Sequence, residues 1–278
     1  MKLYDFDGMF DEKLKEFMEK NAAKYKESDW EDVIPALYKK FGDTYIKSVG
    51  DTPNGFYSKL TNEQLVKALQ THLKNGVPVS EYLCSAIEKR EDYSLLLPLL
   101  DGTESEMEYA INLLGANECA IKKYMSILIS TDDEDMKDRC ADFIKEKADL
   151  VIDEAVKNYK NGVEKELMLE IMSRSVIKRD DVFDILIKEF RGDIDNVPMH
   201  ASYLAAYGDE RALEYLLDKI DEEGISFIEY RELKFAIEAL GGEYDKLRDF
   251  SGDKYYELIK AHEVNPQDIF AQTENKTN

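Results

Sequence analysis

Histidines and clustered carboxylates are the residues of this 278-residue chain that could transfer protons or bind a metal. Its three histidines are His72, His200 and His262, which lie far apart in the sequence. None has the ExxH or HExxH spacing that places two ligands on one face of a helix. His72 lies on an apolar helical face, so we expect a packed, hydrogen-bonded side chain there rather than a metal ligand.

The three cysteines, Cys84, Cys119 and Cys140, are separated by 35 and 21 residues, and no CxxC pair occurs. An odd number of cysteines at these distances fits neither a disulfide framework nor a structural zinc site. Each cysteine is flanked by apolar positions of a predicted helix. We therefore expect three small, buried, apolar side chains in a reducing compartment.

Two acidic segments resemble metal sites only superficially. In DKIDEEGISFIEY, residues 218–230, a calcium-loop alignment on Gly224 places Lys219 first and Tyr230 twelfth, where calcium needs oxygen ligands. STDDEDMKD, residues 130–138, lacks the central glycine and is better interpreted as a solvated helix start. No P-loop, GxGxxG or GxSxG sequence is present. We assign no catalytic, cofactor-binding or metal-binding residues and predict no cofactor, and the partner-binding residues stay unassigned.

The net charge of −22 is distributed unevenly along the chain. Residues 1–77 hold 12 Lys and Arg against 13 Asp and Glu, whereas residues 78–278 hold 25 against 46. Such a surface repels a phosphate backbone and anionic lipid, so we expect neither nucleic-acid nor membrane binding. No apolar run approaches the 18 or so residues of a membrane span, and the N-terminus lacks an apolar signal region. We expect a cytoplasmic, monomeric protein.

An apolar pattern at positions i, i+1, i+4, i+5 and i+8 recurs along the chain, starting at Ala120, Val151, Val182 and Ala212. The last copy consists of Ala212, Leu213, Leu216, Leu217 and Ile220. A weaker copy starts at Tyr93, and the helix preceding each copy has an apolar stripe of its own. Two buried faces per unit require each helical hairpin to pack on the next, which predicts about five stacked hairpins over residues 78–250.

The corner inside each predicted hairpin also recurs. Gly208 can end one helix in a left-handed conformation, Asp209 can cap the next, and Arg211 extends from its first turn. The segments YLAAYGDERALEYLL and AIEALGGE resemble HEAT-like repeats over roughly residues 78–250. The glycine is absent at residues 145–148 and 173–179. The resemblance implies an all-α fold, an α-solenoid (α-α superhelix) of HEAT-like helical hairpins with an N-terminal helical extension.

The chain is therefore predicted to comprise an N-terminal helical extension at residues 1–77, a repeat stack at residues 78–263 and a flexible C-terminal tail at residues 264–278. In the extension, Thr61 and Gln64 form a capping box that opens a helix. The preceding segment GDTYIKSVGDTPNGFY, residues 42–57, is longer than a helix bundle normally needs as a connection. It is either a functional loop or merely a packed or disordered segment.

Charge and the absence of catalytic motifs favour a binding protein over an enzyme. The first hypothesis is a protein–protein interaction scaffold whose acidic repeat surface accepts a basic partner, for example as an antitoxin or immunity-like inhibitor. The alternative is a lyase or another small-ligand-binding enzyme, because the resemblance includes HEAT-like lyases and DNA glycosylases. A cluster of buried ionisable groups in a pocket would favour this alternative.

Overall fold

The computed structural model describes residues 2–262, which form helices and connecting segments without a β-strand, and this confirms the predicted all-α class. The tail predicted at residues 264–278 lies outside the described residues. Contacts divide the chain between Lys123 and Tyr124 into two compact units, here called unit 1 and unit 2. Residues 78–123, predicted as part of the repeat stack, therefore group with the N-terminal helices. Among the described helices, none combines the length and apolarity needed to cross a membrane.

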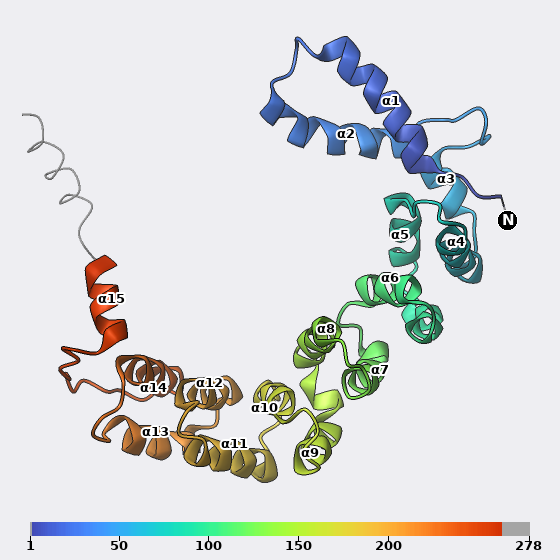
Figure 1. Ribbon diagram of the computed structural model, residues 1–278. Coiled ribbons are helices and arrows are strands. Elements are labelled where there is room, and N and C mark those ends of the chain that lie inside the picture. The colour runs from blue at the N-terminus through green and yellow to red at the C-terminus, as the bar shows by residue number, and fades with distance from the viewer. Residues whose placement is uncertain (1, 263–278) are drawn as a thin grey trace, which may run out of the picture. The chain divides into compact units, whose positions relative to one another are not determined.

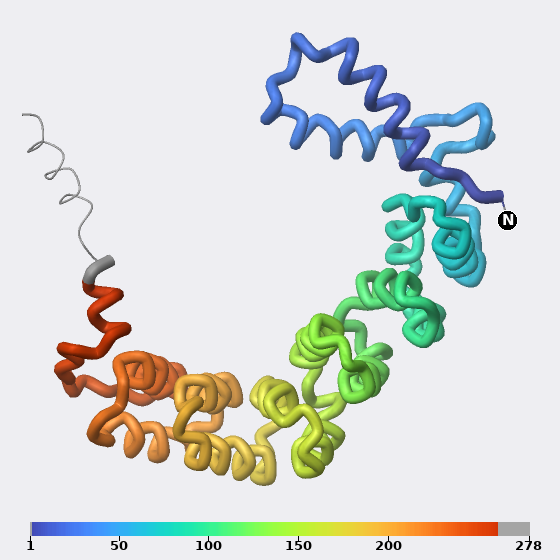
Figure 2. Tube along the Cα trace, viewed as in Figure 1, coloured from blue at the N-terminus to red at the C-terminus, as the bar shows by residue number. Residues whose placement is uncertain are grey.

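Unit 1 contains a series of short helices (Figures 1 and 2). They are α1 (Phe6–Asn21), η1 (Glu27–Asp29), α2 (Trp30–Gly42), α3 (Pro53–Ser58), α4 (Asn62–Asn75), α5 (Glu81–Glu88), η2 (Tyr93–Asp101) and α6 (Glu104–Leu114), followed by α7 (Glu118–Leu128), which spans the division. The capping box of Thr61 and Gln64 opens α4 as predicted. A second one, formed by Thr103 and Glu106, opens α6.

Aromatic side chains form much of the core where α1, α2, α3 and α5 meet. Phe6 and Tyr57 are buried with their rings 5.6 Å apart, and Phe10 packs edge-on against Tyr38 at 4.9 Å. Edge-to-face ring pairs add stability beyond the area that they bury, because the ring edge and ring face carry opposite partial charges. This cluster fixes the positions of α2 and α5 relative to each other.

The segment 42–57 contains most of α3, a helix that was not predicted from the sequence. Thr52 caps α3 by accepting a hydrogen bond from the amide of Gly55, and Pro53 occupies the first helical turn. Gly42, at the end of α2, lies against both neighbouring helices. A Cβ atom there would lie 2.6 Å from the ring of Tyr82 and 2.8 Å from Nδ2 of Asn54. Only glycine permits this approach of α2 to α3 and α5.

Unit 2 consists of helices that alternate along the chain between two neighbouring rows, drawn from green to red in Figure 1. They are α8 (Glu134–Lys145), η3 (Ala148–Leu150), α9 (Ile152–Lys160), α10 (Lys165–Ser173), α11 (Asp180–Gly192), α12 (Val197–Tyr207), η4 (Glu210–Ala212), α13 (Leu213–Ile220), α14 (Phe227–Ala239) and α15 (Lys254–His262). Within unit 2, α8 contacts α10, α10 contacts α12, and α12 contacts α14. Helices α9, α11 and α13 pack beside α10, α12 and α14 respectively.

The recurring apolar pattern is buried in all four copies, with exceptions in the last. Every position of the copies that start at Ala120, Val151 and Val182 is buried. In the fourth copy Ala212, Leu216 and Ile220 are buried, whereas Leu213 is half-buried and Leu217 is 36% exposed. The prediction that Leu217 belongs to the buried stripe is therefore wrong. At 100° per residue Leu217 lies at one edge of the apolar stripe of α13, where burial depends on whether a neighbouring element covers it.

The corners of unit 2 follow the predicted chemistry where glycine is present. Gly208 ends α12 in the left-handed region at φ +70°, and Asp209 accepts a hydrogen bond from the amide of Arg211. The corner between α10 and α11 has no glycine and is held instead by a side-chain hydrogen bond of a serine. Ser175 Oγ donates to Asp149 Oδ1 at 2.5 Å, and this joins the corner to the preceding one.

Candidate functional site

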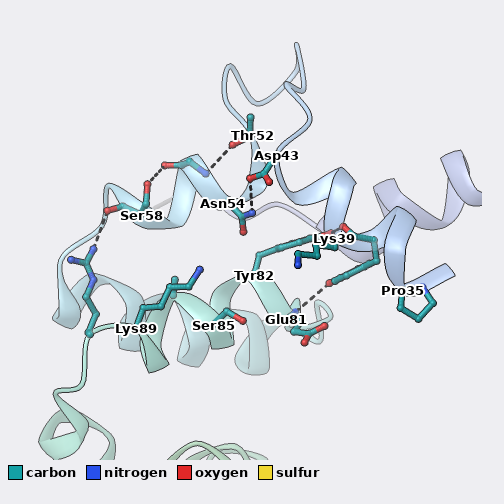
Figure 3. Close-up of a pocket in the computed structure, with 14 residues that line it drawn as sticks. Pro35, Lys39, Asp43, Thr52, Asn54, Ser58, Glu81, Tyr82, Ser85 and Lys89 are labelled. Carbon is teal, nitrogen blue, oxygen red and sulfur yellow. Dashed lines mark hydrogen bonds between the residues drawn. The ribbon is translucent and has the colours of Figure 1, made fainter. Parts of the chain in front are cut away.

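A cleft of about 1000 Å³ opens in unit 1 between α2, α3 and α5 (Figure 3). Its volume falls in the range of small-molecule sites. Its lining combines cations, carboxylates, hydroxyls and an amide. The lining residues are Pro35, Tyr38, Lys39, Asp43, Thr52, Asn54, Gly55, Ser58, Glu81, Tyr82, Ser85, Ala86, Lys89 and Arg90.

Two stacked tyrosines form the wall between α2 and α5. The rings of Tyr38 and Tyr82 lie 4.6 Å apart at an angle of 10°. The Tyr82 hydroxyl donates to the Tyr38 carbonyl, and the Tyr38 hydroxyl donates to Asp7 Oδ1 at 2.6 Å. Burial raises the pKa of both phenols, and the bond to Asp7 raises that of Tyr38 further. Both hydroxyls are therefore neutral and committed at physiological pH, so they hold the wall rather than transfer protons.

The side chains at the start of α3 are fixed by local hydrogen bonds. Asn54 Nδ2 donates to Asp43 Oδ1 at 2.8 Å, which ties α3 to the end of α2 (Figure 3). This bond leaves the second amide proton of Asn54 for another acceptor. On the other side, Arg90 donates to the carbonyls of Ser58 and Leu60 at 2.9 and 2.8 Å and is thereby committed to holding the end of α3.

The α5 face of the cleft carries Glu81, Ser85 and Lys89. Their spacing of four residues places them on one side of the helix, one turn apart. Lys89 is the residue at which α5 ends, so a cation lies at the negative end of the helix dipole. The cleft thus presents a carboxylate, a hydroxyl and an ammonium group in a row.

Two lysines are the uncommitted cations of this cleft. In Figure 3 the side chains of Lys39 and Lys89 extend from α2 and from the end of α5 towards the middle of the cleft. Within the described residues, neither ammonium group has a hydrogen-bond or ion-pair partner. Both lysines are exposed to solvent. The lining holds three cations, the two lysines and Arg90, and two carboxylates, Asp43 and Glu81. Its net charge is therefore +1, in a chain of net charge −22.

His72 and His200 have hydrogen-bond partners within the fold. His72 is buried, and its Nδ1 donates to the Pro78 carbonyl at 2.8 Å. Its Nε2 then accepts from the Tyr57 hydroxyl at 3.3 Å, as the prediction of a packed, hydrogen-bonded histidine requires. His200 is buried in unit 2 with Nε2 3.2 Å from Asp193 Oδ2. His262 lies at the last position of α15.

The cysteines occupy three different environments, which corrects the expectation that all are buried. Cys140 is buried, Cys84 is half-buried, and Cys119 is exposed on α7. Burial raises the pKa of Cys84 and of Cys140 to about 11. Cys119 occupies the second position of α7, where the helix has begun but its neighbours do not yet cover it. The apolar flanks that suggested burial belong to the opposite face.

The acidic segments are held by cations and hydroxyls of the chain itself. Asp221 accepts from the Tyr244 hydroxyl at 2.7 Å and pairs with Lys246 at 2.5 Å, and Glu222 pairs with Lys219 at 2.6 Å. Asp133 caps α8 by accepting from the Met136 amide, as predicted for a helix start. Across residues 2–262, no three His, Cys, Asp or Glu side chains are grouped so that they could bind a metal ion.

Two kinds of turn in unit 2 differ in charge. The linking turns, defined as residues 129–133, 161–164, 193–196 and 221–226, precede α8, α10, α12 and α14. They contain eight acidic residues and no Lys or Arg. The corner turns, defined as residues 146–151, 174–179 and 208–212, precede α9, α11 and α13 and contain five Lys or Arg and four Asp or Glu. The linking turns therefore account for part of the acidity of unit 2.

The corner turns also carry an ion-pair ladder that the sequence analysis missed. Arg179 pairs with Asp153 of α9 at 2.6 Å and with Asp181 at 2.9 Å. One hairpin later, Arg211 pairs with Asp180 of α11 and with Asp209 at 2.8 and 2.7 Å. The recurrence of an arginine after 32 residues, each within two residues of an aspartate, was the available signal.

Comparison of the chain with protein-family models, with curated proteins and with solved structures found no match.

Proposed function

We propose that unit 2 belongs to a HEAT-like α-solenoid that binds a basic protein partner through its linking turns. The observation that carries this proposal is the segregation of charge, since the linking turns hold only acidic charges while the corner turns are mixed. Because each linking turn precedes one of four helices that contact one another in series, the acidic groups follow one another along one edge. The protein acts as a cytoplasmic monomer in this proposal.

Three carboxylates of this edge are available to a partner. Asp132, Asp195 and Glu223 are exposed and have no ion-pair or hydrogen-bond partner within the part of the chain that the structure describes. The other linking-turn acids are committed to internal partners, as Asp221 is to Lys246. Electrostatic complementarity of exposed groups acts mainly on the association rate, because it steers the encounter of the two proteins.

The first prediction concerns neutralisation of these three carboxylates. In the variant Asp132→Asn, Asp195→Asn, Glu223→Gln, association with a basic partner recovered by affinity capture is expected to slow by about three- to tenfold at low salt. The difference should shrink between about 50 and about 500 mM NaCl, since exposed charges are screened within about 8 Å at physiological salt. Stopped-flow or biosensor association rates measure it.

The matched control removes the same charge from another surface. Glu154, Asp184 and Glu214 are exposed acids on α9, α11 and α13 without an ion-pair partner among the described residues. Their neutralisation should leave the rate within about twofold of the wild type. Equal slowing in both triple variants would show that only the net charge matters, and the linking turns would lose their assigned role.

A second candidate function, binding of a small ligand, is favoured by the cleft of unit 1. The cleft has the volume of a ligand site and two uncommitted cations. Its phenols and its arginine are committed to structural bonds. These features favour ligand binding over acid–base chemistry of the lyase kind, because burial raises the pKa of the two cleft phenols, Tyr38 and Tyr82, away from neutrality.

A further inference from the structure

The two free ammonium groups of the cleft, those of Lys39 and Lys89, do not contribute to holding the helices together. Lys39 and Lys89 make no structural bond within the described residues, and they approach one space from two helices. Like charges that face the same space repel each other, and this cost is removed when an anion lies between them. In a chain of net charge −22, the lining of this cleft has a net charge of +1, which favours an anion over a cation as its ligand.

Neutral hydrogen-bond donors lie beside these cations. The Asn54 amide is oriented by its bond to Asp43 and retains one free proton, while the Ser85 hydroxyl lies one helical turn before Lys89. Figure 3 shows Asn54 on the α3 side and Ser85 on the α5 side of the same space. Two ammonium groups and two neutral donors match a phosphate monoester, which has close to two negative charges and three terminal acceptor oxygens at neutral pH.

The remaining groups of the cleft limit what the phosphate can be attached to. The carboxylates of Asp43 and Glu81 line the same cleft and would repel a second or third phosphate. Glu81 is exposed, and its carboxylate can accept hydrogen bonds from ligand hydroxyls. A cleft of about 1000 Å³ leaves room for several carbon atoms beside the phosphate.

We propose that the cleft between α2, α3 and α5 binds a small phosphorylated polyol or sugar, with its phosphate between Lys39 and Lys89 and its hydroxyl groups towards Glu81. This site is separate from the linking turns of unit 2. Its presence or absence therefore leaves the proposed scaffold function unchanged.

The test, which is the second prediction, uses glucose 6-phosphate, inorganic phosphate and glucose as probes. Calorimetric titration of the full-length chain in a chloride buffer of constant ionic strength should show binding of glucose 6-phosphate, weaker binding of inorganic phosphate and none of glucose. The double variant Lys39→Gln, Lys89→Gln is expected to bind glucose 6-phosphate at least about tenfold more weakly, because each charged hydrogen bond to a phosphate is lost.

The matched control is the double variant Lys40→Gln, Lys74→Gln, which makes the same charge change on α2 and α4 at exposed lysines outside the cleft lining. It should bind within about twofold of the wild type. Without ligand the two variants should have equal thermal midpoints, because both lose two positive charges, and this separates lost binding from lost folding. No binding of glucose 6-phosphate to the wild type at about 10 mM, equal weakening in both variants, or glucose binding as tightly as its phosphate would each overturn the proposal.

Discussion

Burial keeps the thiol of Cys140 protonated at neutral pH. Its side chain is 0% exposed on α8, and the loss of solvation raises its pKa to about 11. In the unfolded chain the same thiol ionises near pH 8.5. The two states therefore bind different numbers of protons in the interval between these values.

This difference gives the third prediction, on alkaline stability. The pKa of Cys140 is raised in the folded state, so its contribution is fully present below about pH 8.5 and is lost as the pH rises to about 11. The wild type should lose up to about 3 kcal/mol of unfolding free energy over this interval that Cys140→Ala does not lose. Urea unfolding at a series of pH values measures the difference.

The control for this prediction is Cys119→Ala, because Cys119 is exposed on α7. Its stability curve should run parallel to that of the wild type between pH 8.5 and 11 to within about 1 kcal/mol. If the Cys140→Ala curve also ran parallel to the wild type, the thiol of Cys140 would not be the group that titrates.

Helices are the elements that could be predicted from sequence, because apolar periodicity is a local property. The stripes at Val151 and Val182 identified the buried faces of α9 and α11, and Thr61 with Gln64 identified the start of α4. The same periodicity failed at Leu217, since this residue lies at the edge of the apolar stripe, where burial depends on tertiary neighbours. The short α3 was missed because a six-residue helix has no periodic signal.

The candidate site depends on contacts that no local pattern encodes. Tyr82 bonds to the carbonyl of Tyr38 across 44 residues, and Arg90 bonds to Leu60 across 30. The length of the connection at residues 42–57 marked it as unusual, and this segment does line the cleft through Asp43 and Asn54. Lys39 and Lys89 could not be predicted as cleft residues, because isolated lysines on predicted helices are ordinarily solvent-facing.

The fourth prediction compares two adjacent leucines of α13. Leu216 is fully buried, so Leu216→Asp places an unpaired carboxylate in an apolar environment, at a cost of several kcal/mol. Leu217 is 36% exposed, and Leu217→Asp should cost about 1 kcal/mol or less. Urea denaturation followed by circular dichroism measures both. Equal losses would mean that the buried face of α13 is wrongly assigned.

At the scale of the whole molecule, acidity is the dominant property. Residues 124–278 hold 21 Lys and Arg against 37 Asp and Glu, and the ion-pair ladder at Arg179 and Arg211 commits two of these cations. Exposed pairs of this kind are each worth about 0 to 1 kcal/mol. A large uncompensated negative charge remains, and its self-repulsion opposes the folded state.

The fifth prediction follows from the balance of repulsion and attraction. At pH 7 the net charge of −22 makes repulsion dominant, so added NaCl should raise the thermal midpoint as it screens the like charges. Near the sequence pI of about 4.6 the net charge vanishes while pairs such as Arg211 with Asp209 persist, because the guanidinium of Arg211 lowers the pKa of the Asp209 carboxyl. Salt then screens mainly attractive pairs, and it should leave the midpoint unchanged or lower it. Calorimetric scans from about 10 to about 500 mM NaCl at both pH values measure the thermal midpoint. If the midpoint changed equally with salt at pH 7 and at the pI, net charge would not limit the stability of this protein.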